Sequence, residues 1–311
     1  MAEMMKARGA FTHDLSKNRS LWLMVLPAIL LVIVFSYLPM SGLVLAFKNY
    51  RYNLGIFGSE WCGFDNFRFF FLSGSGWTVT RNTILYNLVN LLTSQLLAVV
   101  VAILLSEIRS KRFRKATQSM IFLPYFISWV LVGTFVFNLF DYDTGVLNAL
   151  RRALGAESVN LYNKPGVWIW IIVLFNSWKW VGYNSVIYLA AITSVDTTCY
   201  EAADIDGASV FQKILYITLP SIVPTIITMI LLNVGRILRG DFQMFYQIIG
   251  NNGQLFAATD IIDTFVFRSL ISSSDLGMTA AATFYQSILC FVIILTVNGV
   301  VKRINSDYAL F

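Results

Sequence analysis

Residues 176 to 184, NSWKWVGYN, place amide, ammonium, indole and phenol groups inside an otherwise apolar stretch of the chain. On a helix, five of these side chains recur at spacings of three and four and so share one face: Asn176, Lys179, Trp180, Tyr183 and Asn184. Aromatic rings that stack on sugar faces, beside groups that hydrogen-bond hydroxyls, could line a carbohydrate pathway. Interfacial anchoring is the alternative, with the rings at the membrane surface and Lys179 reaching towards water.

A second polar set follows another apolar stretch. Asn233, Arg236 and Arg239 are spaced by three residues, so a helix would present them on one face. The two guanidinium groups could bind an anionic sugar. They could instead form ion pairs with Asp241 and hold the end of the stretch in place, which is the interpretation we slightly favour.

The loop from residue 196 to residue 220 combines small, acidic and helix-breaking residues. Residues 201 to 203 favour a helix, Gly207 interrupts it, and residues 208 to 216 can form a second short helix before Pro220. The acidic side chains of this helix-turn-helix could let it dock into the groove of a partner. An amphipathic connector at the membrane surface would have a similar composition, so composition leaves both possibilities open.

The elements that must position these residues are membrane-spanning helices. The chain has 311 residues, of which 57% are hydrophobic and 13% charged, and its mean hydropathy is +0.67. This is the composition of a membrane protein. A helix needs about 20 apolar residues to cross the hydrocarbon core. The sequence predicts an all-α polytopic membrane protein with six spans, at about residues 21–47, 83–105, 120–139, 167–192, 221–238 and 280–301.

Other chemistries lack the residues that they need. Cys62, Cys199 and Cys290 are far apart and have no C-x-x-C spacing, so neither a zinc site nor a disulfide framework is indicated. The single histidine, His13, has no ligand-type neighbours, so we expect neither a bound metal nor a catalytic site. The sequence contains no P-loop, so this chain is not expected to hydrolyse ATP. No basic run lies on a soluble domain, which argues against nucleic acid as a partner.

Basic residues indicate the orientation. Residues 109 to 115 hold five Lys or Arg, and further basic residues precede the first span and follow the last. With six spans these three segments lie on one side, so both termini and the loop 196–220 are predicted to be cytoplasmic. The aromatic and glycine-rich segment 49–81 is then external and is expected to pack as a small cap. Residues 1–81 would hold the N-terminus, the first span and this segment, residues 82–303 the transmembrane domain, and residues 304–311 a C-terminal tail.

The loop 196–220 also carries a recognisable pattern: Glu-Ala-Ala, three residues, Gly, nine residues, Ile, one residue, Leu-Pro. The positions are filled without a gap by Glu201, Ala202, Ala203, Gly207, Ile217, Leu219 and Pro220, and Asp206 precedes the glycine. The loop resembles the signature loop of binding-protein-dependent ABC importer permeases, especially those that import sugars. In that family it forms the coupling helix, which fits a cleft of the ATPase. The resemblance implies that the residues contacting the ATPase include Glu201, Ala202, Ala203, Asp206 and Gly207.

The resemblance covers nearly the whole chain. The segments YLPMSGLVLAFKNYR, GFDNFRFFF, LRGDFQMFYQIIGNNG and VNGVVKRINSDYALF are similar to the branch of carbohydrate permeases devoted to complex oligosaccharides and polysaccharide fragments. When residues are counted back from Glu201, Asn176 and Tyr183 match the sugar-contacting residue types of maltose-type permeases. Lys179 and Trp180 depart from that pattern, and such departures would alter the choice of sugar; a lysine could favour an acidic glycan.

The resemblance implies a type I ABC importer permease in the bacterial cell membrane that imports oligosaccharides. Its partners would be a second permease subunit, two ATPase subunits, an extracellular solute-binding protein and membrane lipid. This chain would bind no cofactor, because ATP and Mg would be held by the partner ATPase.

The alternative is a self-contained secondary transporter or channel, which calls for buried acidic ion sites or repeated halves. The predicted spans offer neither of these. An integral-membrane enzyme would need a His, Cys, Asp or Glu constellation inside the spans, and they contain none. A transport subunit is therefore the favoured prediction.

Overall fold

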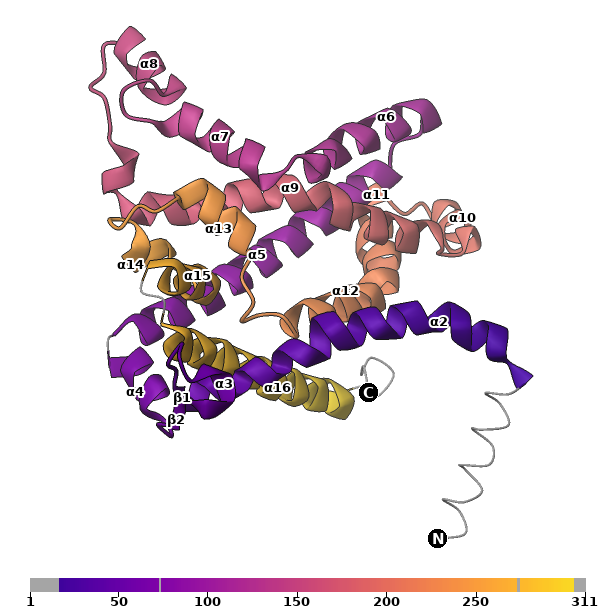
Figure 1. The fold of residues 1–311 in the computed structure, drawn as a ribbon. Coiled ribbons are helices and arrows are strands. Elements are labelled where there is room, and N and C mark those ends of the chain that lie inside the picture. The colour runs from indigo at the N-terminus through magenta and orange to yellow at the C-terminus, as the bar shows by residue number, and fades with distance from the viewer. Residues whose placement is uncertain (1–16, 73, 273–274, 305–311) are drawn as a thin grey trace.

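The computed structural model describes residues 17–72, 74–272 and 275–304, and most of this part of the chain is helical (Figure 1). The predictions for His13 and for residues 305–311 of the tail lie outside the described residues. A short antiparallel ladder pairs β1, Lys48–Asn49, with β2, Glu60–Trp61.

Four helical segments among the described residues are long and apolar enough to cross a membrane: Arg19–Phe47, Ser75–Ser106, Val210–Val234 and Leu276–Arg303. They coincide with the first, second, fifth and sixth predicted spans. The elements within them are α2 (Arg19–Val32), a π-helical turn (Ile33–Tyr37), a 3-10 helix (Leu38–Phe47), α5 (Ser75–Ser106), α12 (Leu219–Val234) and α16 (Leu276–Ile304).

The fourth predicted span is α9, Pro165–Thr193. Its 29 residues are more than enough to cross the hydrocarbon core. It does not belong to the four most apolar segments above, because the polar residues between 176 and 184 lower its hydropathy. The six-span prediction therefore depends on a helix whose middle is polar.

The third predicted span, 120–139, is not one straight helix. The segment Lys111–Phe126 meets α7, Trp129–Phe140, at an angle of 91°. It consists of α6, Lys111–Phe122, and the 3-10 turn η3, Leu123–Phe126. Pro124 cannot donate a backbone hydrogen bond, and the Ser128 side chain accepts one from Leu131 N–H to begin α7 afresh. Together α6, η3 and α7 form what we call the broken span.

The fifth predicted span also ends earlier than the sequence suggests. Helix α12 stops at Val234, and residues 235 to 238 form turns. Arg236 and Arg239 therefore lie beyond the helix, and the expectation that they share one helical face with Asn233 is wrong. Within these turns, Arg239 N–H donates to the Arg236 carbonyl at 2.8 Å, as in a chain that is reversing direction.

Shorter helices connect the spans. They are α3 (Gly55–Gly58), α4 (Asp65–Leu72), α8 (Val146–Ala153), η4 (Leu161–Asn163), α10 (Thr197–Ile205), α11 (Val210–Lys213), the π-helical turn η5 (Ile214–Thr218), α13 (Phe242–Ile249), α14 (Phe256–Thr259) and α15 (Ile262–Ser272).

Helices α5 and α9 pack against each other along much of their length and form the centre of the fold (Figure 1). Their contact is partly polar: Asn176 Nδ2 donates to Ser94 Oγ at 3.2 Å, and the Tyr188 hydroxyl donates to Gln95. Around them lie three apolar clusters, of which the largest includes the buried rings of Tyr86, Trp129, Trp168 and Phe245. This core fixes α9 as the element against which the other parts of the candidate site are placed.

The aromatic segment 49–81, which follows the first span, packs against the last span, α16. The Phe67 ring lies 5.3 Å from that of Phe47 and 6.0 Å from that of Phe284 on α16. Phe70 on α4 is fully buried against Phe265 and Tyr285. The least exposed rings of this segment, those of Phe67, Phe70 and Phe71, thus pack against α15 or α16.

Candidate functional site

The polar face of α9 meets the bend of the broken span. Lys179 is only 6% exposed, and its ammonium group donates to the backbone carbonyls of Tyr125, at 3.0 Å, Pro124, at 3.4 Å, and Ile127. These carbonyls lie at the 3-10 turn η3 and just after it, where the regular α-helical hydrogen bonds have ended. The Pro124 carbonyl also accepts from Ile127 N–H at 3.1 Å. Lys179 therefore acts as an external cap for the bend.

A tryptophan and an aspartate extend this arrangement to α13. The Lys179 ammonium lies 5.2 Å from the centre of the Trp129 ring, and Trp129 Nε1 donates to Asp241 Oδ2 at 2.8 Å. The other Asp241 oxygen accepts from Met244 N–H at 3.1 Å and so caps α13. The charges of Lys179 and Asp241 attract each other through this network. One buried set of groups thus joins α7, α9 and α13.

This network replaces the role that the sequence suggested for Asp241. The ion pairs among the described residues join Arg51 to Glu60, Lys213 to Asp204 and Arg268 to Asp260. The expected pairing of Asp241 with Arg236 or Arg239 is therefore wrong, because the carboxylate is directed towards Trp129 and the start of α13.

A glycine lets α9 approach the broken span closely. A Cβ added at Gly182 would lie 2.6 Å from the carbonyl carbon of Ile121 and 2.8 Å from Cα of Phe122, and it would also overlap the Ile121 oxygen. No side chain can be accommodated there without a backbone shift. Sequence reasoning missed Gly182, although a glycine in the middle of a long helix costs about 1 kcal/mol and so suggests a packing role.

Beside this contact lies a cluster of rings, which we call the bend cluster. It consists of Phe122, Tyr125 and Phe126 on the bend together with Trp180 and Tyr183 on α9. Tyr125 and Tyr183 stack with their ring centres 4.7 Å apart, and the Trp180 ring meets Tyr125 edge-on at 5.5 Å. The three bend residues were not predicted, and the sequence signal for them is the set of rings on both sides of the Leu-Pro at 123–124, with Phe122 before it and Tyr125 and Phe126 after it.

The bend cluster is accessible. Tyr183 is 37% exposed and Phe126 is 71% exposed, while Tyr125 and Trp180 are half-buried. Asn184, next to Tyr183, is also half-buried. An open set of rings with a phenol and an amide at its edge can stack on sugar rings and hydrogen-bond their hydroxyls.

The structure divides the predicted stripe on α9 into two parts. Asn176 and Lys179 are buried and point into the protein, where α5 and the bend satisfy their donors. Trp180, Tyr183 and Asn184 remain wholly or partly accessible. Only this second part is placed to meet a substrate.

The three predicted residues near α12 are exposed. The Asn233 amide donates to the Met229 carbonyl of its own helix at 2.7 Å. Among the described residues no hydrogen bond, ion pair or ring contact joins Asn233, Arg236 or Arg239 to the bend cluster. The two arginines therefore form a separate cationic patch.

The predicted coupling loop forms a helix-turn-helix. The Asp196 side chain accepts from Thr198 N–H at 2.9 Å and caps α10, and this bond holds the pKa of the Asp196 carboxyl below its usual range. Gly207 ends the helix in the left-handed conformation, with φ of +74°. The second helix begins at Val210 rather than Ala208, because Ser209 and Gln212 form a capping box.

The tip of this loop projects from the fold. Glu201, Ala202, Asp206 and Gly207 are exposed and Ala203 is half-buried, while Ile205 is 88% exposed. Small backbone-accessible residues beside an exposed apolar side chain are suited to docking into a cleft of another protein.

The loop is firmly attached to a membrane span. Helix α11, the π-helical turn η5 and α12 form one continuous helical segment, Val210–Val234. Tyr200 OH lies 2.9 Å from Thr218 Oγ1 in η5, and Lys213 pairs with Asp204 at 2.7 Å. These contacts join α10 to the helical segment that continues into α12.

The two bonds that attach α10 are expected to differ in strength. Tyr200→Phe should lower the free energy of unfolding by about 1 kcal/mol, because the bond to Thr218 is partly shielded from water. Lys213→Met should cost less, since its partner Asp204 is exposed and such ion pairs contribute ~0–1 kcal/mol. Thermal unfolding of the purified proteins measures both. Equal losses for the two variants would contradict this ranking.

In the described part of the chain, no group of three or more His, Cys, Asp or Glu side chains is placed to hold a metal ion.

Comparison with known proteins places the chain in a family. The profile of the family described as "Binding-protein-dependent transport system inner membrane component" matches residues 96–306, which is more than half of the chain. In Bacillus subtilis (strain 168), protein LplB is 33% identical over 293 residues, covering 94% of this chain and 92% of LplB. The polygalacturonan/rhamnogalacturonan transport system permease protein YteP of the same organism is 31% identical over 293 residues, covering 94% and 91%.

Solved structures agree with this relationship. A chain of a bacterial ABC transporter involved in the import of the acidic polysaccharide alginate superposes with a TM-score of 0.86 at 32% identity, covering 95% of this chain and 99% of that one. A chain of a bacterial alginate ABC transporter in complex with alginate pentasaccharide-bound periplasmic protein gives a TM-score of 0.84 at 32% identity, covering 94% and 97%. The chain therefore belongs to the family of binding-protein-dependent transport system inner membrane components, and it is a multi-pass ABC importer permease rather than an enzyme.

Proposed function

We propose that the chain forms half of the translocation path of an importer for acidic oligosaccharides. The observation that carries this proposal is the bend cluster, in which accessible rings on α9 and the broken span lie beside Asn184. Such a surface fits the apolar faces and hydroxyl edges of sugar rings. The names of two relatives, for polygalacturonan/rhamnogalacturonan and for alginate, support an acidic glycan as cargo. The exposed Arg236 and Arg239 would attract the carboxylates of such a cargo.

The proposed assembly contains a second permease, two ATPase subunits that bind ATP and Mg, and an external solute-binding protein. The exposed tip at Glu201–Gly207 supports docking to the ATPase, and the bonds of α10 to the segment Val210–Val234 give nucleotide-driven closure a route to the span. The solved alginate importer with its sugar-loaded periplasmic protein supports the external partner. In this assembly both termini and the coupling loop face the cytoplasm, and the segment 49–81 faces outward.

Uptake by the assembled importer in liposomes tests the proposal. Labelled galacturonate oligosaccharides, delivered by the cognate binding protein, should enter only when ATP is present on the ATPase side. Entry without any ATPase would instead show a self-contained transporter, and a failure to carry any oligosaccharide would exclude the substrate class.

A tryptophan pair on α9 tests the site itself. Trp180→Ala should lower uptake about tenfold, because an aromatic stacking contact of about 1.4 kcal/mol is lost. Trp178→Ala is the control, since Trp178 is an accessible tryptophan on the same helix but contacts Phe175 outside the bend cluster. Equal uptake by the two variants would exclude the bend cluster from the sugar path.

A further inference from the structure

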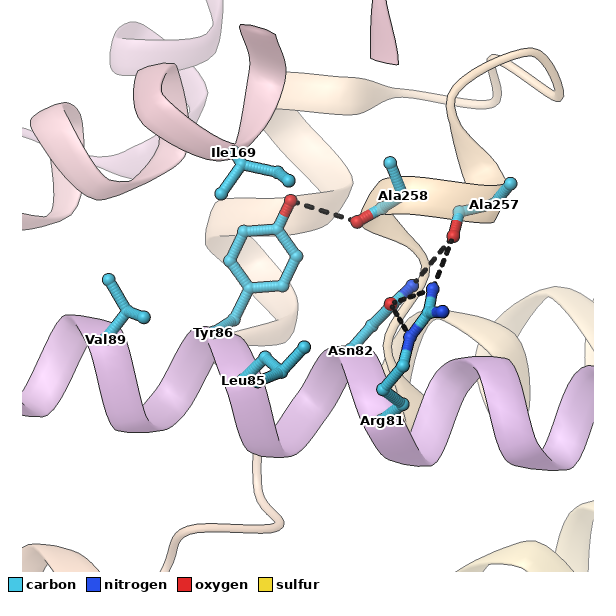
Figure 2. A pocket seen from close by; sticks show the side chains of 8 residues that line it. All are labelled: Arg81, Asn82, Leu85, Tyr86, Val89, Ile169, Ala257 and Ala258. Atoms are coloured by element: carbon cyan, nitrogen blue, oxygen red, sulfur yellow. Dashed lines mark hydrogen bonds between the residues drawn. The ribbon is translucent and has the colours of Figure 1, made fainter. Parts of the chain in front are cut away.

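An apolar cavity of about 480 Å³ lies between the first half of α5, the start of α9 and α14 (Figure 2). Its volume is within the range of ~300–1,000 Å³ that is typical of small-molecule sites. The residues that line it are mostly apolar, including Leu85, Val89 and Ile169. Leu85 and Ile169 are themselves exposed, so the cavity communicates with the outside of the chain.

The polar groups of the cavity gather at one end. Figure 2 shows the Tyr86 hydroxyl donating to the Ala258 carbonyl at 3.0 Å, and the guanidinium of Arg81 contacting Asn82 and the Ala257 carbonyl. The acceptors of Arg81 are neutral, and none of the ion pairs found in the described ranges includes it. Its positive charge is therefore exposed and unbalanced at the rim of an apolar cavity.

The surroundings place this end at the level of the lipid head groups. Trp77 precedes Arg81 by one helical turn on the same face of α5 and is 67% exposed. Trp170, beside Ile169 on α9, is exposed as well. Exposed tryptophans on membrane-spanning helices mark the boundary between lipid and water. From Arg81 to Val89 the helix advances about 12 Å, so the cavity extends from that boundary into the hydrocarbon region.

We propose that this cavity binds an anionic phospholipid. The phosphate pairs with Arg81, and one acyl chain lies along Leu85, Val89 and Ile169. A sugar does not fit this lining, because its hydroxyl groups would lose water without gaining hydrogen bonds. The charge at the rim and the apolar interior match the two ends of one lipid molecule. The proposal depends only on the chain's location in a membrane, and it can fail while the sugar-transport function stands.

The test uses the assembled importer in mild detergent with phosphatidylglycerol as the probe and native mass spectrometry as the readout. Arg81→Gln should weaken phosphatidylglycerol binding about fivefold, the effect of one basic side chain near a membrane surface. Arg68→Gln, at an exposed arginine elsewhere, should leave binding unchanged. Val89→Phe fills the cavity and should weaken phosphatidylglycerol and phosphatidylcholine alike. Leu88→Phe, on the neighbouring exposed face of α5, should not affect either lipid.

Three results would overturn the proposal. Equal lipid binding by Arg81→Gln and Arg68→Gln would exclude Arg81 as the head-group ligand. Displacement of the lipid by inorganic phosphate alone would show a phosphate site rather than a lipid site. If the complex that contains Val89→Phe lost the second permease subunit but still bound lipid, the cavity would be assigned to the contact between the two permeases.

Discussion

Gly182→Ala is expected to abolish transport and to destabilise the protein by about 3 kcal/mol, the upper part of the usual range for overpacking. The added methyl group would overlap the backbone of Ile121 and approach Cα of Phe122 to 2.8 Å. Because these atoms belong to the backbone, the clash cannot be relieved by rotating a side chain. Helix α9 and the broken span would separate, and the bend cluster would lose its packing.

The measurements are ATP-dependent uptake and thermal unfolding of the purified complex. Gly166→Ala provides the control, because Gly166 lies in the first turn of the same helix and an added Cβ there has no heavy atom within 4 Å. Similar unfolding temperatures for the two variants would show that α9 does not depend on close contact with the broken span.

Lys179→Met should cost about 3–5 kcal/mol, as expected when one partner of a buried charge network is removed. The side chain keeps its length, but the carbonyls of Tyr125 and Ile127 lose their donor and Asp241 loses the nearby positive charge. Uptake of acidic and neutral oligosaccharides should fall together, because the lysine positions the bend and does not contact the cargo.

Uptake measured with acidic and with neutral oligosaccharides distinguishes the positioning role of Lys179 from direct contact between Lys179 and the cargo. If the Lys179 ammonium bound a sugar carboxylate, Lys179→Met would lower the uptake of acidic oligosaccharides only and would leave thermal unfolding unchanged. Lys164→Met, at the exposed lysine just before α9, is the control for loss of a positive charge. It should change neither measurement appreciably.

Four of the predicted spans overlap segments that are long and apolar enough to cross a membrane, because this property depends on the number of consecutive apolar residues. The break in the third span could not be predicted this way. Residues 120–139 are mostly apolar and carry no charged residue, and a proline can lie within a transmembrane helix, as Pro27 does in α2. The local cap at Ser128 begins α7, but it does not by itself explain why a helix ends near Pro124 and continues through Pro27. The bend also depends on donors supplied by another helix, above all by the Lys179 ammonium group.

The candidate site was predicted only in part for a similar reason. Helical spacing places Asn176 to Asn184 in one group, but the structure divides this group into a buried and an accessible part, and spacing does not reveal which side faces α5. That side depends on partners such as Ser94, which lies 82 residues away from Asn176 in sequence. The loop around Gly207 was easier, because its helix, its glycine and its capping residues are all specified between residues 196 and 212.

The capping of the bend by Lys179 has a consequence for how the protein is made. A charged residue near the middle of a helix is costly to insert into a membrane by itself. The carbonyls that receive this charge belong to residues 124–127, which leave the ribosome more than 50 residues earlier. The acceptors are thus synthesised before α9 is complete. Because the broken span is synthesised first, it can serve as the insertion partner for α9. Separate expression of α9 should therefore yield a segment that inserts poorly into a membrane.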